Sequence, residues 1–353
     1  MSLPKKRLGT TDMEITRVGF GSWGISGPGW RYAWGPQDDA DSVATIRYAI
    51  EQGVNWIDTA AVYGLGHSEE IVAKALADLP EADRPFVFTK LGLAWDENDR
   101  TAPPRREMSP AGVRREVEGS LRRLGVERID LYQVHWPAED GGPLEYGAET
   151  EAGGERVPGT PLEEYWQVMA DLKAEGKVRA IGLSNHEVPR LERADRVAHV
   201  ESLQPPFSAI NRSAADEIAW SREHDTGVIV YSPMQSGLLT GAFSRDRVAN
   251  LPDGDWRAGH PDFTTGLDAN LALADALRPV AERHGVSVAA IAVAWTLAWP
   301  GITGAIVGAR RPGQVDGWLP AASLELTAAD LDEIATAIVR TGAGQGPAVP
   351  TRS

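Results

Sequence analysis

The chain has 353 residues, no cysteine and a formal net charge of −15, from 35 basic and 50 acidic side chains. The acidic balance excludes a general nucleic-acid or anionic-membrane binder, which needs a basic surface, and the missing cysteines exclude disulfides and thiolate sites. Because a chain with 42% hydrophobic and 24% charged residues carries no recognisable signal peptide or membrane-spanning stretch, we expect a soluble, cytoplasmic globular protein.

Eight short apolar runs are predicted to be β-strands. In chain order they cover 16–23, 54–58, 86–91, 130–135, 178–184, 200–204, 228–232 and 302–308. Helix-like segments separate and follow them, at 39–52, 68–78, 109–123, 161–174, 188–197, 214–224, 269–284, 287–298 and 312–322. Eight alternating β/α units in a chain of this size predict a single closed (β/α)8 TIM barrel over residues 1–340, rather than two domains.

Four segments fall outside this alternation. Residues 3–15 are predicted to form an N-terminal hairpin that plugs the barrel bottom. Long loops are expected after strands 4 and 7, at 138–159, which is rich in Gly and Glu, and at 241–268. Loops of this length are usually functional or disordered. Residues 341–353 are expected to be a disordered C-terminal tail.

Gly19, Gly21 and Gly24 form a G-x-G-x-x-G motif, which in a Rossmann fold binds a dinucleotide at the start of a helix. The sequence that follows, Ile-Ser-Gly-Pro-Gly-Trp, breaks helices. We therefore predict a glycine-lined end of the first strand, where backbone comes close to a ligand.

Four reactive residues lie at or just beyond predicted strand ends: Asp58, Tyr63, Lys90 and His135. Each has an ordinary structural explanation. Asp58 could cap a helix, Tyr63 could be a loop aromatic, Lys90 could be a buried cation with a counter-charge, and His135 could be a core histidine. Because the carboxyl ends of barrel strands meet at one mouth, we expect all four to form an active site.

This combination suits proton delivery to a carbonyl oxygen. An unperturbed tyrosine hydroxyl has a pKa of ~10, and a nearby cation lowers it. Lys90 can supply the cation, Asp58 can hold and balance Lys90, and His135 can orient the carbonyl. None of these side chains supplies electrons, so a hydride cofactor is implied.

The segments that carry these residues resemble the aldo-keto reductase family. The matching segments are GVNWIDTAAVYGLGHSEEIVAKAL (53–76), FTKLG (88–92), DLYQVHWP (130–137), EGKVRAIGLSN (175–185), VYSPMQSGLLTG (230–241) and IVGARRPGQV (306–315), and the resemblance runs from Arg7 to about Val339. It implies that Asp58, Tyr63, Lys90 and His135 are the family's catalytic tetrad, with Tyr63 as the general acid in reduction.

The resemblance also implies a nicotinamide cofactor site. Its expected residues are Gly21, Ser22, Trp23 and Asp58 at the first strands; Ser184, Asn185 and Gln204 at the carboxamide; Tyr231 under the nicotinamide; Ser232, Met234, Gly237 and Leu239 along the pyrophosphate; and Gly308, Arg310 and Gln314 at the adenine ribose. A guanidinium at Arg310 suits a 2′-phosphate, which favours NADPH/NADP⁺ over NADH.

Three positions depart from the family pattern. Gly317 and Trp318 replace an acidic residue and an asparagine at an expected adenine contact, and His186 replaces an aromatic or apolar residue. The substrate pocket is predicted to be aromatic, with Trp23, Trp95 and Trp136, although core packing would explain each tryptophan equally well.

The predicted function is NADPH-dependent reduction of an aldehyde or ketone to the alcohol, with a small-molecule carbonyl or alcohol as the partner. An alternative is a redox-sensing binding subunit of the same fold that holds NADPH with little turnover. A metal-assisted barrel hydrolase is disfavoured because the seven histidines are scattered, and no metal site is predicted. The sequence leaves the physiological substrate, the reaction direction, the oligomeric state, any protein partner and the role of the 138–159 loop open.

Overall fold

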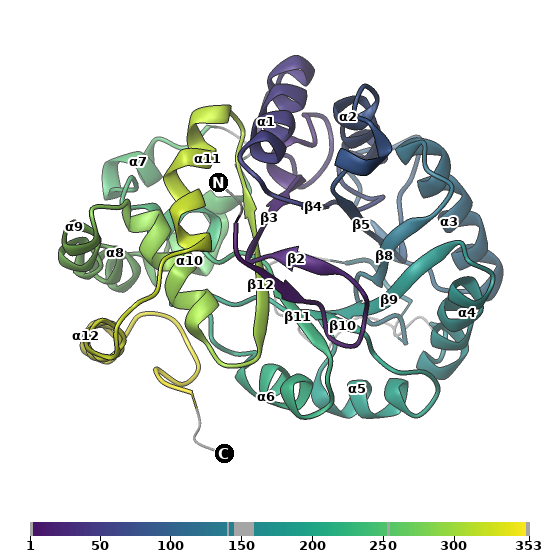
Figure 1. Cartoon of the computed structure of the whole chain (residues 1–353). Helices are drawn as coiled ribbons and strands as arrows, with labels where there is room; N and C mark the ends of the chain where they lie inside the picture. The colour runs from purple at the N-terminus through teal and green to yellow at the C-terminus, as the bar shows by residue number, and fades with distance from the viewer. Residues whose placement is uncertain (1–2, 140, 145–158, 253–254, 351–353) are drawn as a thin grey trace.

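Eight parallel strands close into a barrel with helices around its outside (Figure 1). The computed structural model describes residues 3–139, 141–144, 159–252 and 255–350. Around the barrel the strands are β3 (Val18–Gly21), β4 (Trp56–Asp58), β5 (Phe86–Leu91), β8 (Ile129–Val134), β9 (Val178–Ser184), β10 (Ser202–Gln204), β11 (Gly227–Val230) and β12 (Ile302–Gly308), and β12 pairs with β3. This confirms the predicted (β/α)8 TIM barrel.

The predicted helices are present with small shifts in their bounds. They are α1 (Asp39–Glu51), α2 (His67–Leu76), α3 (Pro110–Leu124), α4 (Leu162–Ala174), α5 (Val188–Asp195), α6 (Ala215–Glu223), α8 (Leu267–Ala276), α9 (Arg278–His284), α10 (Val288–Ala298) and α11 (Pro312–Trp318). The single helix predicted at 269–284 is two helices, because Pro279 lacks an N–H and lies in the first turn of α9. Within the described ranges, no helix is long and apolar enough to cross a membrane.

The prediction missed several elements. The largest is α12 (Ala328–Thr341), which begins with a capping box between Thr327 and Asp330. A short hairpin of β6 (Leu93–Ala94) and β7 (Arg105–Arg106) follows β5. The loop after β11 contains α7 (Arg245–Ala249) and two short 3-10 turns, so it has more regular structure than expected.

The N-terminal hairpin covers one end of the barrel, as predicted (Figure 1). It consists of β1 (Lys5–Arg7) and β2 (Glu14–Thr16), which pair antiparallel. Leu8, Met13 and Ile15 from this segment are fully buried and pack in one cluster with barrel-interior side chains such as Trp56 and Phe88. Because this apolar plug closes the amino-terminal end, access to the barrel is from the carboxyl ends of the strands.

The glycines of the G-x-G-x-x-G motif make room for side chains inside the barrel. A Cβ on Gly19 would lie 2.1 Å from the Trp56 ring, and one on Gly21 would lie 2.7 Å from Ile306. The chain after β3 forms only a three-residue 3-10 turn, Trp23–Ile25, and α1 begins at Asp39. The expectation that these glycines admit a ligand is therefore corrected for Gly19, which accommodates Trp56.

The described part of the C-terminal tail is packed against the loop that follows β10, which differs from the expected disorder. The backbone of Gln345 hydrogen-bonds to Ile210 and Arg212. Arg212 is 3% exposed, and its guanidinium donates to the carbonyls of Ala343, Gly346 and Pro347. A buried guanidinium needs acceptors, and the tail supplies them. Residues 351–353 lie outside the described residues.

Candidate active site

A cavity of about 610 Å³ opens at the carboxyl ends of the barrel strands. Its volume is within the range of small-molecule and cofactor sites. Most of the predicted site residues line it: Gly21, Ser22, Trp23, Asp58, Tyr63, His135, Trp136, Ser184, Asn185, Gln204, Tyr231, Ser232, Met234, Gly237, Gly308, Arg310 and Gln314. Lys90, Trp95 and Leu239 are not among the lining residues.

Asp58, which lines the cavity, forms a buried ion pair with Lys90, which does not. Asp58 ends β4 and Lys90 lies on the neighbouring β5, with side chains 4% and 1% exposed. Lys90 Nζ donates to Asp58 Oδ1 and, at 3.0 Å, to the carbonyl of Thr59. Burial lowers the pKa of Lys90, while the Asp58 carboxylate opposes that shift. The Lys90 ammonium is therefore held by Asp58 and Thr59.

Tyr63 lies between this ion pair and the cavity. Lys90 Nζ is 5.1 Å from the centroid of the Tyr63 ring, and the His135 ring meets Tyr63 edge-on at 5.7 Å. Desolvation raises the pKa of Tyr63 well above its ordinary value, and the Asp58 carboxylate adds to that shift. The expectation that this pKa is lowered is wrong, because desolvation of the hydroxyl and the Asp58 carboxylate both raise it. Tyr63 is therefore protonated at neutral pH.

His135 is a neutral donor or acceptor at the mouth of the barrel. Its side chain follows β8, and its backbone N–H bonds to the carbonyl of Leu91 at 3.0 Å. Burial lowers the pKa of His135 well below its ordinary value, and the nearby Lys90 charge adds to the effect. Among the described residues, Nδ1 has no hydrogen-bond partner. An uncharged imidazole beside Tyr63 suits hydrogen bonding to a carbonyl oxygen.

The predicted carboxamide-binding residues form one hydrogen-bonded group. Ser184 Oγ donates to the Gln204 carbonyl at 2.8 Å, and Asn185 Nδ2 donates to the His135 carbonyl at 2.9 Å. Tyr231 donates its hydroxyl hydrogen to Asn185 Oδ1 at 2.8 Å. Asn185 has a φ of 61°, a left-handed conformation that Asn tolerates better than most residues. The group joins the ends of β8, β9, β10 and β11.

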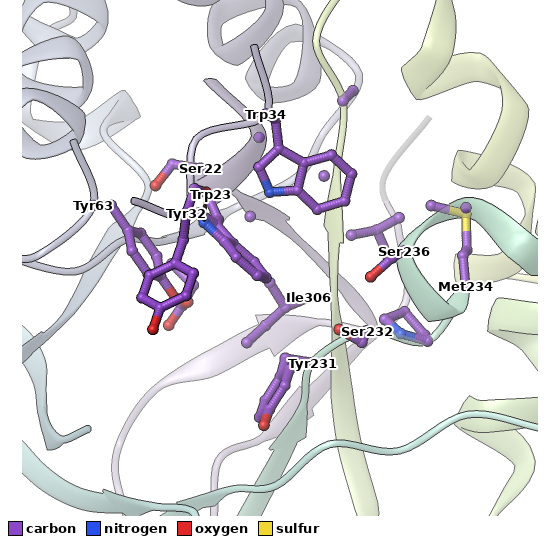
Figure 2. A pocket seen from close by; sticks show the side chains of 18 of the residues that line it. Ser22, Trp23, Tyr32, Trp34, Tyr63, Tyr231, Ser232, Met234, Ser236 and Ile306 are labelled. Atoms are coloured by element: carbon purple, nitrogen blue, oxygen red, sulfur yellow. Dashed lines mark hydrogen bonds between the residues drawn. The ribbon is translucent and has the colours of Figure 1, made fainter. Parts of the chain in front are cut away.

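The chain after β11 winds along the cavity in an irregular turn. Ser232 and Ser236 have φ values of 56° and 51°. Figure 2 shows Ser232, Met234 and Ser236 on one side of the cavity and Tyr63 with Trp23 on the other. The side chain of Leu239, predicted to contact the pyrophosphate, is fully buried in the core instead. Ser236 and Thr240, which the sequence did not single out, line the cavity in its place.

Arg310 lies after β12 at the far end of the cavity, as predicted, but it is not free. Its guanidinium donates to the carbonyl of Pro36 and, at 2.9 Å, to Gln37 Oε1. Its backbone N–H donates to Gln314 Oε1 at 2.7 Å. Arg247 and Arg257 also line the cavity and were missed. Burial lowers the pKa of Arg310, and the positive charges of Arg257 and Arg311 add to the shift.

The part of the cavity next to Tyr63 and Trp23 is more aromatic than predicted. Trp23 stacks on Tyr63 at 6.1 Å and on Trp256 at 5.8 Å, and Trp34 meets Trp23 edge-on at 5.5 Å. In Figure 2, Trp23 lies between Tyr63 and Trp34. The cavity is also lined by aromatic residues that were missed: Trp30, Tyr32 and Trp34. The dense aromatic composition of 23–34 was the available signal.

The remaining predicted residues have clear positions. Trp136 lines the cavity, whereas Trp95 packs beside it in a cluster with Leu93 and Leu144. His186 is 2% exposed and bonds through Nδ1 to the Ser184 carbonyl at 2.8 Å. Burial lowers its pKa to about 4, so it is a neutral core residue.

Of the three departures from the family pattern, Gly317 and Trp318 line the cavity, whereas His186 does not. Most of the 138–159 loop, at 140 and 145–158, lies outside the described residues. Over the ranges that the structure describes, no group of three or more His, Cys, Asp or Glu side chains is arranged to hold a metal.

The sequence of residues 17–339 matches the model of the aldo/keto reductase family. The chain belongs to the aldo/keto reductase family. It is 34% identical over 335 residues to the aldo-keto reductase YhdN of Bacillus subtilis (strain 168), covering 94% of this chain and 92% of that protein. It is 33% identical to an NADH-specific methylglyoxal reductase of Escherichia coli (strain K12), covering 96% of this chain and 100% of that protein.

Solved structures of aldo/keto reductases are similar over 94–100% of the chain. A glycerol dehydrogenase from Gluconobacter oxydans superposes with a TM-score of 0.82 and 35% identity, covering 100% of both chains. Family membership makes the chain an oxidoreductase that reduces carbonyl groups and uses a nicotinamide cofactor. The names of these relatives give different substrates, methylglyoxal and glycerol, and only one of them names a cofactor, NADH, so membership fixes neither for this chain.

Proposed function

We propose that the chain reduces an aldehyde or ketone to the alcohol with NADPH as its preferred cofactor. The observation that carries this proposal is the protonated Tyr63, which faces the cavity between a neutral His135 and the buried Asp58–Lys90 pair. A reduction needs one proton at the carbonyl oxygen, and Tyr63 is the group placed to donate it.

The residues present fit a nicotinamide dinucleotide. Gln204 is 2% exposed and lines the cavity, and its Oε1 receives no hydrogen bond from any described residue, so a ligand N–H would satisfy it. Ser184, Asn185 and Gln204 would hold the carboxamide, Tyr231 would support the ring, and Arg310 would reach the adenosine end. When bound, the reduced nicotinamide supplies a hydride.

The chain's own residues then account for the proton. Tyr63 donates its hydroxyl hydrogen to the carbonyl oxygen, and the phenolate that remains lies 5.1 Å, measured at its ring centroid, from the Lys90 ammonium. Neutral His135 donates a hydrogen bond to the same oxygen and so orients the carbonyl. Because desolvation raises the pKa of Tyr63, alcohol oxidation at neutral pH first requires an unfavourable deprotonation. At neutral pH Tyr63 is in the protonated form that reduction uses.

NADPH is proposed because positive charge accumulates at the far end of the cavity. After burial, the nearby charges of Arg257 and Arg311 lower the pKa of Arg310, and the Asp255 carboxylate opposes them. An excess of guanidinium groups suits a ligand that carries a 2′-phosphate as well as a pyrophosphate. One relative is named as NADH-specific, so cofactor preference requires direct measurement.

The test is steady-state turnover of 4-nitrobenzaldehyde with NADPH and with NADH at matched concentrations, beside a fluorescence titration of each cofactor. We expect turnover with both and a higher kcat/KM with NADPH. Tight NADPH binding without turnover of any aldehyde or ketone in a panel would contradict a reductase and support the redox-sensing subunit.

A further inference from the structure

Gln133 is a buried polar residue to which neither the family tetrad nor the carboxamide group assigns a role. It lies on β8, is fully buried, and is paired in register with Lys90 on β5 and with Gly182 on β9. A Cβ on Gly182 would lie 3.2 Å from Gln133 Cγ, so the absence of a side chain at Gly182 leaves room for the glutamine. A primary amide in this position needs hydrogen-bond partners.

Gln133 bonds to two residues of the site. Its Nε2 donates to Asp58 Oδ2 at 3.4 Å, and its Oε1 accepts from Gln204 Nε2 at 3.2 Å. Gln204 Nε2 also donates to Asp58 Oδ2, at 2.9 Å. A carboxylate only accepts hydrogen bonds, so Asp58 fixes the NH₂ ends of both glutamines toward itself.

This arrangement uses both hydrogens of the Gln204 amide. One goes to Asp58 and the other to Gln133, so the plane of the amide is fixed by two bonds rather than one. The opposite end, Oε1, is then left facing the cavity, where no described residue donates to it. If Gln133 were apolar, a single bond to Asp58 would remain, and the amide could rotate about it.

We propose that Gln133 is a positioning residue that holds the Gln204 amide so that Oε1 accepts a hydrogen bond from the carboxamide N–H of the nicotinamide cofactor. The inference rests on the proposed use of such a cofactor. It predicts that Gln133 acts through Gln204 on one hydrogen bond and leaves other cofactor contacts unchanged.

The test compares NADP⁺ with its 3-acetylpyridine analogue, which lacks the carboxamide N–H, by fluorescence titration at one salt concentration. The wild-type chain should bind NADP⁺ more tightly than the analogue by about 2- to 10-fold, the usual effect of one neutral hydrogen bond. Gln133→Leu should bring the ratio of the two Kd values, analogue to NADP⁺, close to one by weakening NADP⁺ binding alone. Gln133→Met, which preserves side-chain length, should do the same.

Three further variants separate positioning from packing. Ser202→Ala removes a buried barrel hydroxyl that has no partner among the described residues, so the ratio should stay as in the wild type. Gln204→Leu should also bring the ratio to one, and the double variant Gln133→Leu, Gln204→Leu should change it no further.

Gln133→Glu should behave like glutamine when its new carboxyl is protonated. That carboxyl can donate to Asp58 and accept from Gln204, so the ratio should recover at low pH. It should fall as the pH rises, because two adjacent carboxylates repel and the ionised form cannot donate to Asp58.

Several results would overturn the inference. A Gln133→Leu variant with an unchanged ratio, whether both ligands weaken together or neither does, would mean that Gln133 only packs. A Gln204→Leu variant with the wild-type ratio would mean that Oε1 is not the acceptor. A wild-type chain that binds neither dinucleotide would overturn the proposed function and this inference together.

Discussion

Replacing Arg310 with alanine should weaken NADPH binding more than NADH binding, since only NADPH carries a 2′-phosphate. A charge-assisted hydrogen bond contributes about 1.5–3 kcal/mol. In this structure the guanidinium already donates to Pro36 and Gln37, so binding the phosphate would replace one neutral bond of about 1 kcal/mol. The net effect of roughly 0.5–2 kcal/mol corresponds to an increase of about 2- to 30-fold in the Kd for NADPH relative to NADH.

The assay is fluorescence titration of both cofactors at low and high salt, and the matched control is Gln37→Ala. That variant removes the Oε1 acceptor of Arg310 and keeps the guanidinium, so its preference for NADPH should be equal to or greater than that of the wild type. High salt should reduce the wild-type preference, because Arg310 is only half-buried.

Equal losses for NADPH and NADH in Arg310→Ala would refute the phosphate contact. They would show that Arg310 acts only by holding the segment around Gln37 over the adenosine end. If neither cofactor is weakened, the 2′-phosphate is held elsewhere, and Arg311 is the next residue to replace.

Three other predictions concern stability and are measured by urea unfolding. Asp58→Asn should lower the free energy of unfolding by about 3–5 kcal/mol, because it leaves the Lys90 ammonium buried without its carboxylate; a loss below about 1 kcal/mol would mean that the pair is not ionised. Gly19→Ala should cost about 1–3 kcal/mol through overlap with Trp56, whereas Gly313→Ala, where nothing lies within 4 Å, should be nearly neutral. Burial raises the pKa of Glu116 from 4.5 to about 7. The free energy of unfolding should therefore include the full contribution of the protonated Glu116 below pH 4.5 and lose it as the pH rises through 7. Glu116→Gln should remove this loss of stability, and a variant with the wild-type pH profile would contradict the shift.

The barrel was predictable because its strands and helices alternate with clear periodicity. The clustering of the four proposed catalytic residues was predictable because Asp58, Lys90 and His135 lie at or just beyond the ends of three neighbouring strands that the topology brings together. The direction of the Tyr63 pKa shift was not predictable, since it depends first on how far the hydroxyl is desolvated and then on the nearby Asp58 carboxylate. Both are set by side-chain packing around the ends of the strands, which a sequence does not record.

Long-range packing accounts for the other differences. Trp256 stacks on Trp23 from a loop 233 residues away by their numbers in the sequence, and periodicity carries no information about such pairs. The C-terminal tail has a composition typical of disorder, yet carbonyls at 343–347 satisfy the buried Arg212. Arg310 lines the cavity after β12, but its bonds to Pro36 and Gln37 depend on the path of the loop after β3.

The most direct test of the central claim is Tyr63→Phe, assayed for aldehyde reduction and for NADPH binding in the same preparation. The substitution removes one hydroxyl at the reacting centre and no proposed cofactor contact. General acid catalysis is worth roughly 10²- to 10⁴-fold, so kcat should fall by about that factor while the Kd for NADPH stays nearly unchanged. A variant that keeps a third of the wild-type kcat would contradict the assignment of Tyr63 as the proton donor.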